Sequence, residues 1–227
     1  MKESITQSLS SLADRHPHLL GSLRAGVRAV RRRQAAPQVR AVEASLDNLS
    51  TLICEDVCLQ VNEFDGRFYL DARSALFRRL AREGEYEPGL SALCRKHVDP
   101  ARDVLDIGAN IGFHAVLFGK LLQSGRVLSV EPTNNALARL KRNVQVNGVQ
   151  ERVVIHHGAV SDKSGPIEIR TIPGREEFSS AGNLDHPAVR GAAFNIETVT
   201  ASTVDQLVAE YALNPGFIKV DVEGLEH

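Results

Sequence analysis

The sequence has few of the features that mark secreted, membrane-spanning or metal-binding proteins. It has only three cysteines in 227 residues, a sparse set that is compatible with a reducing cytoplasm. It contains no run of about eighteen apolar residues that could cross a bilayer. The opening residues Met-Lys-Glu-Ser are not followed by the apolar stretch of a secretory signal. We therefore expect a cytoplasmic protein without a transmembrane segment.

The cysteines do not complete a metal site either. Cys54 and Cys58 are four residues apart, but no second pair or histidine cluster accompanies them. We predict that these two residues and Cys94 are small apolar fillers and that the protein has no metal ligands.

An excess of one charge is also missing. Lys and Arg number 27 against 28 Asp and Glu, which gives a net charge of −1. This balance gives no argument for nucleic acid, and we expect none among the partners. Basic residues gather in 1–50, and we interpret them as the solvated face of a helix, with contact to an acidic surface as the alternative.

One stretch carries the most information about function. An apolar run with a single acid leads into a glycine turn, and an amphipathic helix follows at once. The turn reads Asp106-Ile107-Gly108-Ala109-Asn110-Ile111-Gly112. A dinucleotide fingerprint requires glycine at its third and sixth positions, but Asn110 occupies the third and Gly112 comes one place early. The pattern favours a nucleoside with an amino-acid tail, S-adenosylmethionine, over a pyrophosphate.

A second part of the signal lies one strand further along the chain. Residues 126–131 form a short apolar run that ends in Glu131. An acid at the tip of the second strand of such a sheet can accept hydrogen bonds from both ribose hydroxyls. The turn, this carboxylate and the strand–helix alternation together predict a nucleoside site.

The alternation of strands and helices predicts a doubly wound parallel sheet. We expect strands at 103–107, 126–130, 152–156 and 217–222, with helices at 111–122, 134–147 and 203–211. This α/β core, a Rossmann-like sheet over 100–227, follows a helical extension at 1–48 and a hairpin and helical lead-in at 49–99. The strand at 217–222 has no later neighbour, so we expect a sheet that is truncated at its C-terminal side.

Residues 163–200 leave this pattern. Residues 166–171 and 195–199 alternate like antiparallel strands. The polar loop between them, 173–191, is long for a compact domain, and we interpret it as an insert that faces the substrate.

Four blocks of the sequence resemble the FkbM family of methyltransferases. They are Asp106–His114, Glu131-Pro132, Ala159–Asp162 and Lys219–Gly224 with Glu226. The resemblance covers about residues 85–227. It implies a class I, S-adenosylmethionine-dependent methyltransferase that acts on a hydroxyl oxygen of a sugar or a secondary metabolite. The expected partner is therefore a small-molecule or glycan acceptor.

The motifs assign expected roles to the cofactor-binding residues. In the turn, Gly108, Ala109 and Gly112 bring backbone close to the methionine end, Asn110 bonds within the turn or to the ligand, and Asp106 orients the turn or reaches the cofactor ammonium. Glu131 and Pro132 face the ribose. Val160 and Ser161 follow the third strand, where the adenine is expected.

The last strand carries the candidate catalytic residues. Lys219, Asp221 and Glu223 alternate with apolar residues, so their side chains share one side of the strand. Burying them unpaired is costly, so they either pair with one another or line a cavity. Asp221, Glu223 or His227 is the expected general base for removing the proton of an acceptor hydroxyl.

Two other functions remain open at this point. A nicotinamide-dependent oxidoreductase shares the same sheet, although the missing third-position glycine disfavours it. A non-catalytic binding module is the other alternative. The sequence does not specify the oligomeric state.

Overall fold

The computed structural model describes residues 41, 44, 45, 48, 49, 52, 53, 55–172 and 193–222. The chain divides into two compact units, Met1–Leu49 and Ser50–His227. The few described residues of the first unit are helical. Most of the helical extension expected at 1–48 lies outside the described residues, as do Cys54 and the loop at 173–191.

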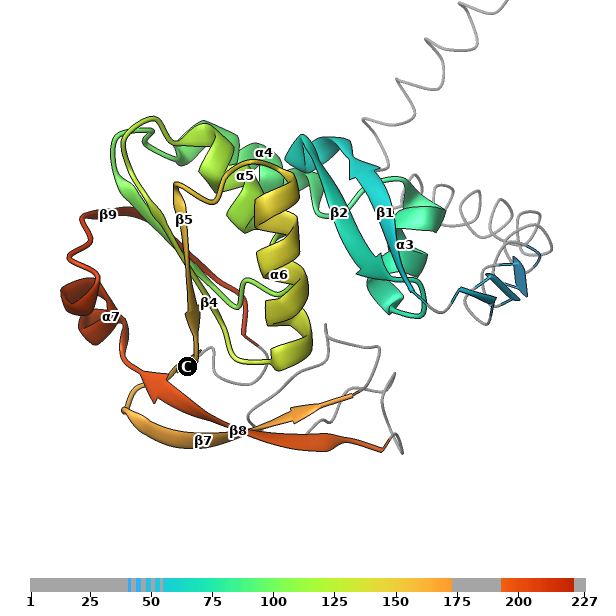
Figure 1. The fold of residues 1–227 in the computed structure, drawn as a ribbon. Coiled ribbons are helices and arrows are strands. Elements are labelled where there is room, and N and C mark those ends of the chain that lie inside the picture. The colour runs from blue at the N-terminus through green and yellow to red at the C-terminus, as the bar shows by residue number, and fades with distance from the viewer. Residues whose placement is uncertain are drawn as a thin grey trace, which may run out of the picture. The chain divides into compact units, whose positions relative to one another are not determined.

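The second unit alternates strands and helices in the order that the sequence predicts (Figure 1). Its elements are β1 (Asp56–Val61), the 3-10 helix η1 (Asn62–Phe64), β2 (Gly66–Asp71), α3 (Ala75–Glu83), α4 (Pro88–His97), β3 (Asp103–Ile107), α5 (Phe113–Leu121), β4 (Val127–Glu131), α6 (Asn134–Val146), β5 (Val153–His157), β6 (Ala159–Val160), β7 (Gly165–Thr171), β8 (Asn195–Ser202), α7 (Val204–Glu210) and β9 (Pro215–Val220).

The central sheet is parallel, with the strand order β5-β4-β3-β9. Leu105 of β3 lies opposite Leu128 of β4 on one side and Ile218 of β9 on the other. Every residue of β3 and β4 is buried, as expected for parallel strands that are covered on both faces. The carboxyl ends of β3, β4 and β9 therefore meet at one edge of the sheet, where ligands bind in such folds.

One face of the sheet carries most of the hydrophobic core. The buried cluster includes residues of the hairpin, of α3 to α6 and of the first strands of the sheet, among them Phe64, Phe68, Phe118 and Leu140. Helix α6 lies between the hairpin β1–β2 and the sheet (Figure 1). The hairpin is a separate two-stranded sheet, as predicted, but it shares its core with the parallel sheet.

The opposite face is covered less completely. A smaller cluster joins Leu128 and Val130 to Leu207 of α7. Strand β9 pairs only with β3 among the described residues, so the edge position expected for this strand is confirmed there. The side chains of Ile218 and Val220 stay 46% and 55% exposed.

Local signals explain several element boundaries. Ser74 caps α3 by accepting a hydrogen bond from the Phe77 backbone at 3.0 Å. Gly148 follows α6 with φ +68°, the left-handed conformation predicted for a helix end. Thr203 and Gln206 form a reciprocal capping box at the start of α7. Helix α5 begins at Phe113 rather than at 111, because Gly112 precedes it in a left-handed conformation.

The structure adds one strand that the sequence analysis does not include. Ala159 and Val160 form β6, which pairs in parallel with β8. Strand β8 also pairs with β7 in the predicted antiparallel sense. The result is a three-stranded sheet beside the parallel one. Among the described residues no helix has the length and apolar character needed to span a membrane.

Candidate functional site

The turn after β3 alternates left-handed and right-handed backbone. Gly108, Asn110 and Gly112 have φ values of +75°, +49° and +95°. Asparagine tolerates this region better than most residues with a side chain. The backbone N–H groups of Gly108 and Ala109 both donate to the Val130 carbonyl at 3.0 Å. This bonding fixes the turn against the end of β4.

The two glycines of the turn have protein neighbours that explain them. A Cβ atom at Gly108 would lie 1.9 Å from the backbone oxygen of Asp221, and one at Gly112 would lie 2.6 Å from Leu140 Cδ1. Together with the positive φ angles, these contacts require glycine at both positions. The expected approach to a cofactor is therefore not the only reason for the glycine pattern.

Glu131 lies beside the turn, as the sequence argument requires. Its Oε2 accepts a hydrogen bond from the Asn110 backbone at 2.8 Å, and its Oε1 accepts from the backbone N–H and the hydroxyl of Thr133 at 2.9 and 2.7 Å. The residue is only 5% exposed. Burial raises the pKa of the Glu131 carboxyl, and these hydrogen bonds oppose the rise.

A buried lysine links the ends of β3 and β9. The Lys219 ammonium lies 3.2 Å from Asp106 Oδ1 and 3.5 Å from Asp221 Oδ2, and it donates to the Gly108 carbonyl at 3.2 Å. Burial alone would lower the pKa of Lys219, but the two carboxylates outweigh it and raise the pKa. The lysine therefore stays protonated and fixes the turn to β9.

A pocket opens over the turn. Its lining comes from Leu76 of α3, Tyr86 of the linker before α4, residues 108–114, Lys219 and Asp221. Burial is the main cause that raises the pKa of Tyr86. The Tyr86 phenol thus stays protonated, and its side chain hydrogen-bonds Glu87. Tyr86 also packs on Phe113 with ring centroids 5.4 Å apart.

His114 also lines this pocket. The residue is 4% exposed and its ring lies against the Phe64 ring at 5.1 Å. Burial lowers the pKa of His114 to about 4. The imidazole is therefore neutral at pH 7.

The buried polar atoms around the turn have the chemistry that the amino-acid tail of a nucleoside requires. Asp106 Oδ2, Asn110 Oδ1 and His114 Nε2 have no hydrogen-bond partner in the described part of the chain. Buried polar groups are normally paired. Asn110 lines the pocket, and Asp106 is buried under the turn without lining it. Acceptor oxygens in and under the turn fit a ligand with an ammonium or hydroxyl donors, so the residues present are compatible with S-adenosylmethionine.

Other predicted site residues lie elsewhere. Val160 packs against the cluster under α7, and the Ser161 backbone donates to the Ser202 carbonyl at 3.1 Å. The Pro132 carbonyl is 3.0 Å from His157 Nε2. None of these residues lines the pocket over the turn, and neither do Asp106 and Glu131, which are buried beside the turn. Glu223 and His227 lie outside the described residues, and the described residues contain no group of three potential metal ligands.

The fold and the arrangement at its strand ends define a Rossmann-like class I methyltransferase. The parallel sheet, the glycine turn after β3 and the acid at the end of β4 are its elements. The family described as Methyltransferase FkbM domain matches residues 106–227. The chain belongs to this family.

Individual relatives cover smaller parts of the chain. The tRNA wybutosine-synthesizing protein 2 homolog of Danio rerio is 30% identical over 79 residues, which are 33% of this chain and 19% of that protein. The chain thus spans about a fifth of the length of this relative. P. horikoshii TYW2 in complex with MeSAdo is 17% identical, with a TM-score of 0.35, over 46% of this chain and 36% of that one. An O-methyltransferase from Bacillus cereus in complex with SAH is 22% identical, with a TM-score of 0.26, over 29% and 30%.

Proposed function

We propose that the protein binds S-adenosylmethionine over the turn after β3 and methylates a hydroxyl oxygen of a small molecule or a glycan. The observation that carries the proposal is the contact between Glu131 and the Asn110 backbone at 2.8 Å. This hydrogen bond connects the turn, which lacks the third-position glycine of a pyrophosphate-binding fingerprint, to a carboxylate that can bind a ribose.

Different residues of the chain would bind different parts of S-adenosylmethionine. A carboxylate offers about four acceptor positions, and Glu131 uses three of them within the protein. One position on Oε2 is left for a ribose hydroxyl. Asp106 Oδ2 and Asn110 Oδ1 supply acceptors for the amino-acid end. Bound S-adenosylmethionine would supply a methyl group that its sulfonium already activates, so the protein mainly has to align the acceptor oxygen.

Asp221 is the proposed general base. It follows the last residue of β9, its side chain is 59% exposed, and it lines the pocket. The Lys219 ammonium lies 3.5 Å from Asp221 Oδ2 and holds the side chain in place at the end of β9. The carboxylate would accept the proton of the acceptor hydroxyl as the oxygen attacks the methyl carbon. Glu223 and His227 remain alternative candidates for the same role.

The acceptor can be a small molecule, a glycan or an RNA. The hydroxyl preference comes from the resemblance to the FkbM family. The relative from Danio rerio carries a tRNA-modifying name, so RNA belongs among the acceptors to be tested. A nicotinamide cofactor and a purely binding role remain the alternatives.

The experiment has two stages. Calorimetry with S-adenosylhomocysteine and with NAD(H) should detect binding of the first compound only. Tritiated-methyl transfer from S-adenosylmethionine should then be measured with sugars, lipid and polyketide extracts and total tRNA. Binding of NAD(H) alone would overturn the cofactor assignment, and label in tRNA alone would overturn the acceptor assignment. Cofactor binding without any transfer would favour a binding module.

A further inference from the structure

Two asparagines at the end of α6, Asn143 in the helix and Asn147 at its C-cap, bond to the edge of β2 as a neighbouring strand would. Asn143 accepts from the Tyr69 backbone N–H at 2.7 Å and donates to the Tyr69 carbonyl at 3.2 Å. Asn147 does the same with Arg67, at 3.0 and 2.7 Å. Residues four apart lie on one face of a helix, and residues two apart present their backbone groups to one edge of a strand. The two spacings match.

Only one of the two asparagines also reaches the turn of the candidate site. Asn143 Nδ2 donates to the Ile111 carbonyl at 2.8 Å. Asn147 Nδ2 instead makes its further bond to the Asn143 carbonyl, one helical turn back, at 2.8 Å. Asn143 is fully buried, and both hydrogens of its amide are used, one on β2 and one on the turn.

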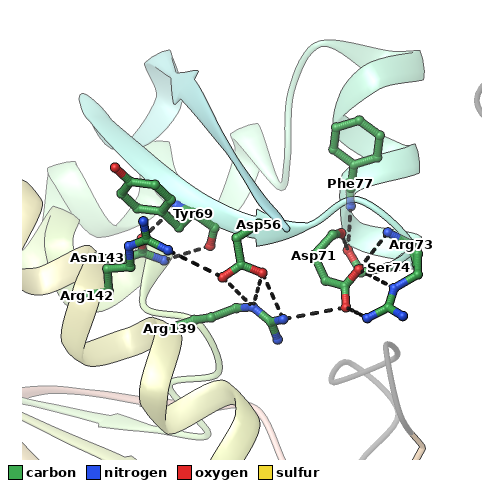
Figure 2. A network of polar contacts seen from close by, with 9 residues as sticks. All are labelled: Asp56, Tyr69, Asp71, Arg73, Ser74, Phe77, Arg139, Arg142 and Asn143. Carbon is green, nitrogen blue, oxygen red and sulfur yellow. Dashed lines mark hydrogen bonds and ion pairs between the residues drawn. The ribbon is translucent and has the colours of Figure 1, made fainter. Parts of the chain in front are cut away.

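The hairpin is fixed on α6 by charged groups as well (Figure 2). The Arg139 guanidinium binds both oxygens of Asp56, with Nε–Oδ2 and Nη2–Oδ1 distances of 3.2 and 2.9 Å. The Arg142 guanidinium lies 3.3 Å from the centroid of the Tyr69 ring. Figure 2 shows Asn143 between the Tyr69 backbone and these arginines. The hairpin edge that Asn143 contacts is therefore held in place along the helix.

A second contact places the hairpin against the residues that follow the turn. The Phe64 ring of η1 stacks on Phe113, the first residue of α5, with a centroid distance of 4.9 Å and an interplanar angle of 12°. The turn at 108–112 is thus restrained at the Ile111 carbonyl, which accepts from Asn143 of α6, and directly after it at Phe113, which packs on Phe64. Asn143 also bonds to Tyr69 of β2, so the hairpin contributes to both restraints.

We propose that Asn143 is a positioning residue for the methyl-donor site: its amide bridges the Tyr69 backbone of β2 and the Ile111 carbonyl, so that docking of the hairpin sets the shape of the turn at 108–112. The proposal rests on the proposed function for its consequence, because that function puts the donor over this turn. Without the amide, a buried carbonyl at Ile111 loses its donor, and the turn relaxes to regain one.

The test compares Asn143→Ala with Asn147→Ala. Each variant removes two bonds to β2, those to Tyr69 in Asn143→Ala and those to Arg67 in Asn147→Ala, but only Asn143→Ala removes the bond to the turn. Amide hydrogen exchange, measured without ligand, should speed up in β2 in both variants and around residues 108–116 in Asn143→Ala alone. The Kd for S-adenosylhomocysteine should rise about tenfold or more in Asn143→Ala and less than about twofold in Asn147→Ala.

The outcomes separate this proposal from the proposed function. Equal exchange in the turn for both variants would overturn the positioning role, whatever the ligand does. Faster exchange in the turn with no binding by the wild-type chain would support the bridge and refute the donor site. If Asn143→Ala does not fold, Asn143→Ser carries the same test, because its hydroxyl can still satisfy one of the lost partners. Equal Kd values for the serine variant and Asn147→Ala would then count against the proposal.

Discussion

The site has a closed side, where β3 and β4 end, and an open side at β9, and the two sides hold their charges differently. Asp106 and Asp221 share one ammonium, that of Lys219, at 3.2 and 3.5 Å. The Asp106 side chain is fully buried, whereas the Asp221 side chain is 59% exposed. A buried ion pair requires good geometry to offset desolvation, but an exposed one does not. The closed side is therefore the rigid part of the site.

This difference agrees with the two halves of a methyl transfer. In the proposed function the methyl donor binds on the closed side, where bonds of 2.7 to 2.9 Å fix Glu131 to the turn and to Thr133. An acceptor must enter and leave, and the exposed carboxylate at the end of β9 lies on the accessible side. Substitutions on the closed side and on the open side test this difference separately.

The largest expected effect comes from removing the shared ammonium. Lys219→Met leaves the Asp106 carboxylate buried without its partner, and loss of one member of a buried pair costs about 3–5 kcal/mol of unfolding free energy. Urea denaturation followed by circular dichroism measures it. Lys163→Met is the matched control, because Lys163 and Asp162 form a pair at 4.0 Å that is almost entirely exposed. Similar losses in both variants would show that burial does not distinguish the two pairs.

The second effect concerns pH and the closed side. The pKa of His114 is lowered from 6.5 to about 4. Between these values the unfolded chain binds a proton that the folded chain does not, so stability is present above pH 6.5 and is lost as the pH falls towards 4. The slope is at most about 1.4 kcal/mol per pH unit, or about 3 kcal/mol over the window.

His114→Phe should remove this contribution, because the site already contains the rings of Phe64 and Phe118. The measurement is the unfolding free energy at several pH values, as the difference between variant and wild type. His97→Phe at the exposed end of α4 serves as control. A pH slope that is unchanged in His114→Phe would contradict the buried, neutral imidazole.

The third effect tests the open side. Asp221→Asn should lower turnover by about 100-fold, or about 2.7 kcal/mol, if Asp221 is the general base. Its exposed side chain predicts little change in stability or in the Kd for S-adenosylhomocysteine. Single-turnover methyl transfer and calorimetry measure the two quantities. A rate within about threefold of the wild type would transfer the role to another residue.

The sequence predicted the parallel sheet because its signal is local. Each of these elements is predicted from its own residues, without knowledge of its neighbours: β3, β4 and β5 from their apolar runs, and α6 from its periodic apolar stripe. It missed β6, because a two-residue strand has no periodicity and depends on pairing with Ala201 and Ser202, some forty residues later in the chain. It also missed the role of Asn143, since an asparagine in a helix resembles a surface residue until its partner strand is known.

The site shows the same division between local and distant signals. The proximity of Glu131 to the turn followed from strand order alone. The pair of Lys219 with Asp221 followed from their spacing on one strand, but the pair of Lys219 with Asp106 on the neighbouring strand was not predicted. The pocket wall from Leu76 and Tyr86 did not follow from strand order. It depends on how the hairpin and α3 dock on the core. The docking of the hairpin and α3 depends on side-chain contacts between segments that are far apart in the sequence. No regular residue spacing in a single sequence predicts such contacts.

The smallest of these effects is specific to donor binding on the closed side. Glu131→Ala should weaken S-adenosylmethionine binding by about 1–3 kcal/mol, the range for a lost charge-assisted hydrogen bond and its unpaired partner. Because the substitution also frees the backbone N–H groups of Asn110 and Thr133, some stability is lost too. Glu131→Gln, which retains an acceptor for part of these bonds, should show a smaller loss of stability with a comparable loss of affinity. Calorimetric affinity unchanged in both variants, with Glu168→Ala on β7 as control, would remove Glu131 from the donor site and leave the closed side as a structural element only.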